Sequence, residues 1–213
     1  APQEAPSGAT VFDTWWRTAG ADLYTSKASV PSGSEASKWE MFNGNIRSTS
    51  NSSGVITFIS PETHKSYMFQ ATLSSDDTDD DLIGLVMAYT RQGNDNHLLI
   101  ACRTVGAGGI GGISTYCNTF SILYYKNNTL VRVVHSGVDL GGTKSGWGGY
   151  STRVEVRKEG SVFITRASTW NSSDLSGGTL TVDVASDPSL AVFNTQKSNW
   201  GFFALSQRNA MFS

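Results

Sequence analysis

Two apolar runs separated by a short polar turn lie near the middle of the 213-residue chain. The runs are Leu82–Tyr89 and Leu98–Cys102, and the segment Thr90–Asn96 between them contains Gly, Asn and Asp. Two short apolar runs joined by such a turn are typical of a β-hairpin. Because polar residues do not interrupt these runs, we expect protein to cover both faces of the hairpin. The sequence therefore predicts a hairpin in the core of a β-sandwich.

The rest of the chain consists of short apolar or alternating segments bounded by turn residues. Asn43-Gly44, a strong hairpin-turn signal, joins Trp39–Phe42 to Ile46–Thr49. Further strands are predicted over 55–59, 67–73, 119–125, 130–135, 151–158, 162–169, 180–184 and 200–206. Only 188–193 is typical of a short helix or turn, so we expect less than about a tenth of the chain to be helical. The prediction is all-β: a single antiparallel β-sandwich of jelly-roll type over residues 11–213, preceded by a linker or disordered segment over residues 1–10.

Charge and hydropathy argue against several classes of partner. The chain has 16 Lys and Arg against 18 Asp and Glu, and its formal net charge is −2. No basic cluster stands out, so binding to nucleic acid or to an anionic membrane is not expected. No apolar run approaches the roughly 18 residues that span a bilayer. The opening residues, APQEAPSG, do not resemble a signal peptide and look like a linker or the edge of a larger polypeptide.

Five aspartates fall directly before the first apolar run, at positions 76, 77, 79, 80 and 81. Calcium takes six to eight oxygen ligands, and neighbouring carboxylates with backbone carbonyls supply several from one loop. Asp76, Asp77 and Asp79 are the predicted calcium ligands; Asp80 and Asp81 point in opposite directions in an extended chain, which makes them weaker candidates. The alternative is a solvated acidic strand entry that discourages edge-to-edge pairing.

Three segments resemble one known family. DDDLIGLVMAY (Asp79–Tyr89) with the following HLLIACR resembles a strand pair of the thrombospondin C-terminal domain, and WGFFALSQRNAMF (Trp200–Phe212) resembles its closing strand. Gly146-Trp147 and the later RVEVRKEGSVFI resemble the loop and hairpin between them. The resemblance covers residues 67–213. It implies a laminin-G-like, concanavalin A-like jelly roll that binds glycans or protein surfaces and often carries calcium on acidic loops.

The chain departs from the animal members of that family. It lacks their calcium-binding repeats and their disulfides, and it ends at Ser213, just past the Ser-Gln motif. Its Ser, Thr, Asn and Gly-rich composition is more similar to lectin-like modules of phage tail fibres and bacterial adhesins. Cys102 and Cys117 are interpreted either as two buried thiols or as a disulfide that joins neighbouring strands.

Aromatic and polar residues in loops are the candidate ligand contacts. Trp147 and Tyr150 belong to the glycine-rich segment SGWGGY, and loops carry binding residues more often than strands do. Arg91 and Asn94, in the turn of the central hairpin, complete the predicted ligand-binding set. Trp39 and Trp200 lie in strand patterns and are expected in the core.

Residue patterns that would indicate a catalytic site are weak in this sequence. Glycanases of the concanavalin A-like fold use paired carboxylates, and Glu155 and Glu159 have a spacing of four residues. Glu155, however, alternates with valines as in a half-exposed strand, and Glu159 precedes a turn glycine. No E-x-D-x-x-E, G-x-S-x-G or P-loop motif is present. We therefore predict no enzymatic activity.

Together these features predict a non-catalytic carbohydrate- or receptor-binding module. The setting most consistent with the resemblance is a phage tail-fibre tip or a surface adhesin, in the virion or at a cell surface, with a cell-surface glycan or host receptor as partner and calcium as cofactor. Two alternatives remain open: a glycanase or lyase of the same fold, and a structural module that drives homo-oligomerisation of a fibre.

Overall fold

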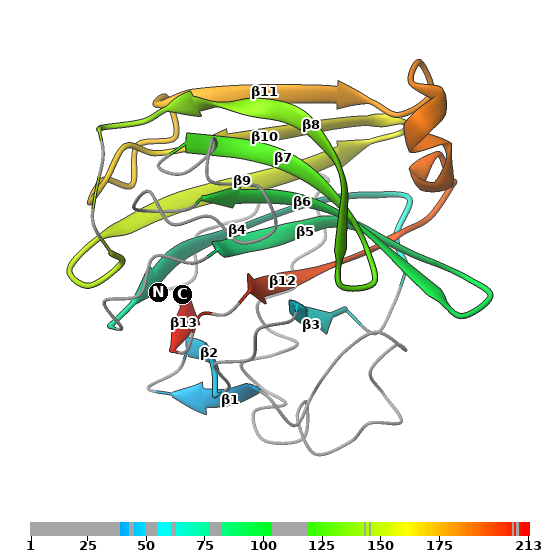
Figure 1. Cartoon of the computed structure of the whole chain (residues 1–213). Coiled ribbons are helices and arrows are strands. Elements are labelled where there is room, and N and C mark those ends of the chain that lie inside the picture. The colour runs from blue at the N-terminus through cyan, green and yellow to red at the C-terminus, as the bar shows by residue number, and fades with distance from the viewer. Residues whose placement is uncertain are drawn as a thin grey trace.

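The computed structural model describes residues 39–42, 45–49, 55–60, 63–76, 82–103, 119–142, 144, 146–205, 207 and 209–213. These residues form two antiparallel sheets that pack face to face (Figure 1). One six-residue 3-10 helix, η4 (Pro188–Phe193), is present in this part of the chain. The predicted fold class, an antiparallel β-sandwich with little helix, is confirmed. No helix among the described residues is long and apolar enough to cross a membrane.

Within the described residues, seven strands form one sheet and six form the other. In spatial order the seven-stranded sheet contains β1 (Trp39–Phe42), β2 (Asn45–Ser48), β13 (Ala210–Phe212), β4 (Ser66–Ser75), β9 (Ser151–Glu159), β10 (Val162–Ala167) and β11 (Gly178–Asp183). The six-stranded sheet contains β3 (Val55–Ile59), β12 (Asn199–Leu205), β5 (Leu82–Gln92), β6 (Asp95–Arg103), β7 (Thr119–Lys126) and β8 (Thr129–Asp139).

The predicted hairpins form where the sequence places turn residues. β5 pairs with β6 through a turn in which Gly93 has φ +58°, and β9 pairs with β10 around Gly160, with φ +62°. Asn127 (φ +55°) closes the β7–β8 hairpin, and its side chain accepts a hydrogen bond from the Asn96 amide at 2.9 Å. Positive φ is accessible to glycine without strain and to asparagine more readily than to most residues. Local turn chemistry therefore determines these connections.

The main core lies between the inner faces of the two sheets. Trp39 and Trp200 are buried there, as predicted, together with the valines of β9, Val154 and Val156. The alternation in β9 is also as predicted, since Arg153 and Arg157 lie on the opposite, outer face. Period-two alternation is what a strand with one face on the core requires.

A second apolar cluster lies on the outer face of the six-stranded sheet, and we call it the outer apolar layer. Its members alternate along each strand with residues of the main core, so they point away from the seven-stranded sheet. They are Ile59, Leu82, Val86, Tyr89, Leu98, Ile100, Cys102, Leu123, Tyr125, Phe203 and Leu205. The prediction that the central hairpin is covered on both faces is thereby confirmed.

Candidate functional site

One end of the sandwich gathers the ends of four strands and the loops that follow them. The register pairs Ile83 with Arg103 in one sheet and Ser74 with Ser151 in the other, so Arg103, Asp76 and Tyr150 all lie toward this end. The loop after β8 (140–150) and the loop after β10 (168–177) meet here (Figure 1). We call it the aromatic end, after Trp147, Tyr150 and Trp170.

Arg103, the last residue of β6, connects the two loops at the aromatic end. Its guanidinium is fully buried and donates to Ser168 O at 3.0 Å, to Leu140 O at 3.2 Å and to Thr152 Oγ1 at 3.1 Å. It also stacks 3.7 Å from the centroid of the Trp170 ring. Burial lowers the pKa of Arg103 to about 10, against an opposing effect of Asp139, so the side chain stays charged at neutral pH. Among the residues that the structure describes, no group accepts a hydrogen bond from its Nε.

Trp170 lies at the centre of the aromatic end and is partly exposed. Besides the Arg103 contact, its ring packs edge-on against Trp147, with centroids 5.6 Å apart, and at a tilt against Tyr150 at 6.0 Å. Its Nε1 donates to Gly142 O at 3.1 Å. These contacts hold the indole in one orientation. Trp170 is not in the ligand-binding set predicted from the sequence. The polar residues on both sides of it, Thr169 and Asn171–Asp174, are the sequence signal that indicates a loop position.

Tyr150 was predicted as a ligand contact and is also partly exposed. The ammonium of Lys144 lies 4.9 Å from its ring centroid. The neighbouring residue Ser151 is held by Asn171, whose amide donates to Ser151 O at 2.7 Å and whose Oδ1 accepts from the Ser151 amide at 2.9 Å. The loop after β10 is therefore joined to the start of β9 by one backbone and one side-chain hydrogen bond, and to Tyr150 by the contact between its ring and Trp170.

Trp147 does not reach the surface. Its exposed fraction is 0 %, and it is among the largest fully buried side chains of the main core. A buried indole has no ring face to offer to a sugar, so the prediction that Trp147 stacks on a ligand is wrong. Its ring instead packs against Trp170 and helps to hold that ring in place.

Arg91 and Asn94 lie at the opposite end of the sandwich from Tyr150. Both are exposed in or beside the β5–β6 turn, where Arg91 Nε donates to Gly93 O at 3.0 Å. β5 has 11 residues, which at about 3.3 Å per residue separates its two ends by about 30 Å. The structure thus does not bring the four predicted ligand-binding residues together in one site.

Asp76 is the one predicted metal ligand within the described residues. It is exposed and follows β4 at the aromatic end, two positions after Ser74. Asp77 and Asp79 lie outside the described residues, as do Asp80 and Asp81. Within the described part of the chain no three His, Cys, Asp or Glu side chains are close enough to hold a metal ion. Calcium binding therefore stays a prediction.

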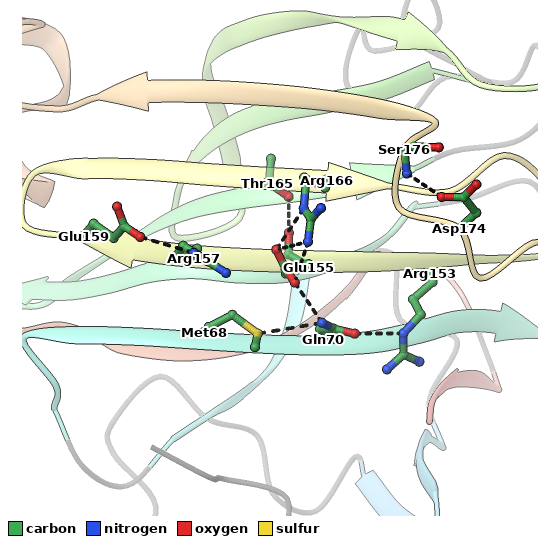
Figure 2. Close-up of polar contacts among 10 residues, drawn as sticks. All are labelled: Met68, Gln70, Arg153, Glu155, Arg157, Glu159, Thr165, Arg166, Asp174 and Ser176. Atoms are coloured by element: carbon green, nitrogen blue, oxygen red, sulfur yellow. Dashed lines mark hydrogen bonds and ion pairs between the residues drawn. The ribbon is translucent and has the colours of Figure 1, made fainter. Parts of the chain in front are cut away.

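Glu155 lies on the outer face of the seven-stranded sheet, with an exposed fraction of 3 %. Figure 2 shows its carboxylate between Arg166 and Gln70. Arg166 Nε donates to Oε1 at 3.0 Å and Nη2 to Oε2 at 3.1 Å, while Gln70 Nε2 donates to Oε2 at 2.8 Å. Arg153 Nε donates in turn to Gln70 Oε1 at 3.0 Å. Glu155 is therefore buried, whereas the sequence predicted a side chain on a half-exposed strand. The carboxylate tolerates this burial because it accepts three hydrogen bonds, two of them from a charged guanidinium.

Glu159 is bound separately, by Arg157 at 3.4 Å (Figure 2). Four residues of extended chain separate the Cα atoms of Glu155 and Glu159 by about 13 Å. The two catalytic carboxylates of a glycosidase flank one scissile bond, whereas Arg166 and Gln70 hold Glu155 and a different arginine, Arg157, holds Glu159.

Cys102 is a free, buried thiol. Cys117 lies outside the described residues.

Of the comparisons with known proteins, the one with solved structures bears on the fold. No protein-family model matches the chain, and no curated protein matches it. Among solved structures, a seed lectin of Lotus tetragonolobus is similar, with a TM-score of 0.50 and 10 % identity over 82 % of this chain and 86 % of the lectin. At this identity the likeness shows the fold alone: an antiparallel β-sandwich of the jelly-roll type that this lectin has.

Two further solved structures are similar at lower scores. Lectin I from Ulex europaeus, in complex with the methyl glycoside of α-L-fucose, has a TM-score of 0.47 and 10 % identity over 82 % of this chain and 86 % of the lectin. The CBM2 module of the evolved Dit of Lactobacillus casei BL23 phage J-1 has a TM-score of 0.42 and 15 % identity over 98 % of this chain and 88 % of that module.

Proposed function

We propose that this chain is a non-catalytic glycan-binding module whose ligand contacts Trp170 and Tyr150. The observation that carries this proposal is the pair of partly exposed aromatic rings held in fixed orientation at the loop end of a lectin-like sandwich. Aromatic rings offer large contact area to the apolar face of a sugar at low cost in side-chain entropy. Because Arg103 and Trp147 fix Trp170 beforehand, little ordering is required on binding.

Polar groups surround the two rings. Thr169 and Asn171 are exposed beside Trp170, and Lys144 lies against Tyr150. Binding sites for small polar molecules combine aromatic surface with a few convergent hydrogen-bonding groups. The aromatic end supplies both kinds of contact to a sugar ring and its hydroxyls.

The geometry of Glu155 supports a non-catalytic role. A general acid must exchange a proton with the substrate, whereas Arg166 and Gln70 occupy both carboxylate oxygens of Glu155. The nearest glutamate along the strand, Glu159, binds a different arginine. This arrangement stabilises a sheet face and differs from a carboxylate pair set for hydrolysis.

The biological setting that we propose is a phage tail-fibre tip or a surface adhesin that recognises a cell-surface glycan or host receptor. The support is the combination of a lectin-like fold with a Ser, Thr, Asn and Gly-rich composition. We further propose that calcium orders the acidic loop that begins at Asp76, beside the aromatic end.

A glycan array of bacterial surface polysaccharides and animal glycans, followed by calorimetric titration of the best ligand, tests the proposal. Tyr150→Ala and Trp170→Ala should each weaken binding about 5- to 150-fold, which corresponds to about 1–3 kcal/mol for aromatic stacking on a ring ligand. Val131→Ala, an exposed position on β8 away from the aromatic end, is the matched control and should leave the Kd unchanged.

Three results would contradict the proposal. Equal affinity in all variants would place the ligand elsewhere. Release of reducing ends from a bound polysaccharide that Glu155→Gln abolishes would indicate a glycanase or lyase. An absence of glycan binding together with stable oligomers in sedimentation experiments would favour a structural oligomerisation module.

A further inference from the structure

Four cationic side chains lie at the end of the sandwich opposite the aromatic end, and we call them the basic cluster: Lys65, Arg91, Lys158 and Lys197. Lys65 precedes β4, Arg91 and Lys158 lie near the ends of β5 and β9, and Lys197 precedes β12. Figure 1 shows η4 and the β5–β6 turn at this end. Lys65 and Lys158 are 93 positions apart in sequence, so the sequence contains no basic run that would indicate the cluster.

The pairing of two segments places Lys65 beside Lys197. His64 and Ser198 form an antiparallel bridge, in which the His64 amide donates to Ser198 O at 2.9 Å and the Ser198 amide donates to His64 O at 3.1 Å. Lys65 and Lys197 are the next residues on the same side of this bridge. In an antiparallel pair, residues next to a hydrogen-bonded pair bring their side chains close together. Like charges in facing positions are destabilising, so folding brings these two lysines together against their repulsion.

The pairing of β12 with β5 places Arg91 on the other side of Lys197. Asn199 pairs with Tyr89, and both Lys197 and Arg91 lie two residues beyond that pair, at the same end of it. Arg91 Nε donates to Gly93 O at 3.0 Å, which holds the side chain against the β5–β6 turn. Lys197 is therefore flanked by a cationic residue on each of the two neighbouring segments.

Lys158 adds a further ammonium group from the seven-stranded sheet. Its Nζ donates to Lys65 O at 2.8 Å and to Gly160 O at 2.9 Å. Burial, followed by the charge of Lys65, lowers the pKa of Lys158. The two ammonium groups are thus close enough to repel each other, and a bound anion would offset this repulsion.

The carboxylates at this end of the sandwich are held by other groups. Within the described residues, Glu159 binds Arg157 at 3.4 Å, Asp187 binds Arg132 at 2.6 Å, Asp95 lies 3.6 Å from Lys126, and Asp183 accepts from Ser161 Oγ at 2.8 Å. No ion pair in this part of the chain includes a member of the basic cluster. Four positive charges are thus concentrated in a molecule whose formal net charge is −2, and such a concentration attracts anions.

We propose that the basic cluster is a second binding site, which takes the carboxylate or phosphate groups of an anionic polysaccharide. Lys65, Arg91 and Lys197 are exposed and contact the anionic groups, whereas the buried Lys158 contributes its charge from inside. Lysine and arginine offer only hydrogen-bond donors, which suits both kinds of anion. This site goes beyond the one proposed at the aromatic end and does not depend on it.

Neutral polar side chains next to the cluster favour a polysaccharide over other polyanions. Asn94 follows Arg91 in the β5–β6 turn, and Asn194 and Gln196 precede Lys197; all three are exposed. Side-chain amides both donate and accept hydrogen bonds, as sugar hydroxyls do. Nucleic acid is a poorer match, because domains that bind it are strongly basic overall, whereas this chain is slightly acidic.

Calorimetric titration of the full chain with two anionic polysaccharides tests the proposal. The probes are polygalacturonate, which carries carboxylates, and phosphomannan, which carries phosphates; dextran and dephosphorylated mannan are the neutral controls. We expect at least one anionic probe to bind at an ionic strength of about 0.01 M and to bind more weakly at about 0.15 M, because salt screens exposed charges. The stronger of the two identifies the preferred anion, and the neutral polymers should bind more weakly than either.

Paired charge substitutions locate the site. Lys65→Gln with Lys197→Gln should weaken binding of the anionic probe about 5-fold or more, the combined effect of two exposed ion pairs. Lys126→Gln with Arg157→Gln is the matched control. It removes the same charge from side chains that bind Asp95 and Glu159, and should leave the Kd unchanged. Trp170→Ala should also leave it unchanged, which separates this site from the aromatic end.

Four results would overturn the proposal: no binding of either anionic probe, equal losses in the Lys65–Lys197 variant and its control, a loss in Trp170→Ala as large as in the lysine variant, and tighter cluster-dependent binding of a DNA oligonucleotide. Circular dichroism checks that the lysine variant is folded. Should it unfold, Arg91→Gln takes its place, and unchanged affinity in that variant would equally refute the site.

Discussion

Trp147 and Trp170 lie at the same end of the sandwich, yet only Trp170 reaches the surface. The glycines around Trp147 suggest an exposed loop tip in the sequence. In the structure they allow a tight turn instead: Gly149 has φ +82°, and the Tyr150 amide donates to Trp147 O at 2.8 Å. This turn directs the indole into the core. The glycines in the sequence indicate that the loop can bend. Whether the Trp147 indole then faces solvent or the core depends on tertiary packing, which the sequence pattern does not show.

Trp147→Ala should destabilise the domain strongly. Removal of a fully buried tryptophan leaves a cavity, and such changes cost about 3–5 kcal/mol. Thermal unfolding followed by circular dichroism measures the loss. Tyr150→Ala is the matched control and should cost far less, because its ring is partly exposed. A melting temperature of Trp147→Ala equal to that of the unsubstituted chain would contradict a core role.

At the scale of elements, hairpins were predictable from the sequence and the convergence of loops was not. A hairpin depends on neighbouring residues, such as the apolar runs of β5 and β6 and the turn at Gly93. The aromatic end depends on Arg103, which joins residues 37 to 65 positions away in sequence. No local pattern marks such contacts. Arg91 and Asn94 show the same limit. They are exposed polar residues at a turn, as a ligand contact requires, but that turn lies at the end of the sandwich opposite Tyr150.

η4 begins with a charged cap that predicts a pH dependence. Asp187 accepts hydrogen bonds from Arg132 Nη1 at 2.6 Å and from the Ser189 amide at 3.1 Å. The bond from Arg132, followed by those from Ser189, lowers the pKa of Asp187. A carboxylate with a lowered pKa stabilises the fold above its unfolded pKa of about 3.9, and this contribution is lost as the pH falls through the folded pKa.

We therefore expect Asp187→Asn to lower the melting temperature at pH 7. The difference in melting temperature between this variant and the unsubstituted chain should shrink as the pH falls below about 4. Calorimetric melting temperatures between pH 7 and pH 2 test this. Arg132→Gln removes the largest cause of the pKa shift, so it should show the same convergence at low pH. A constant difference between Asp187→Asn and the unsubstituted chain over the whole pH range would contradict the assignment.

At the scale of the whole molecule, the two outer faces of the sandwich differ in chemistry. The seven-stranded sheet presents the hydrogen-bonded network of Gln70, Arg153, Glu155 and Arg166, whose charges are compatible with water (Figure 2). The six-stranded sheet presents the outer apolar layer. The aromatic end is the loop end where Asp76 also lies.

Calcium should stabilise the whole domain if the acidic loop binds it. Five carboxylates between positions 76 and 81 repel one another, so ordering them without a cation costs free energy. A ligand that binds only the folded state adds about 2.7 kcal/mol at a hundredfold excess over its Kd. In protein first stripped of metal, calcium should raise the melting temperature and a chelator should reverse the rise. Magnesium should act less, because its small octahedral shell fits a many-oxygen loop poorly.

Substitutions within the acidic loop locate the effect. Asp76→Ala, Asp77→Ala and Asp79→Ala should each remove most of the calcium-dependent rise in melting temperature. Asp183→Ala is the matched control: this exposed aspartate ends β11, away from the acidic loop, and its loss should leave the calcium effect intact. Identical melting curves with calcium and with chelator would instead identify the five aspartates as a solvated edge whose mutual repulsion keeps other strands away.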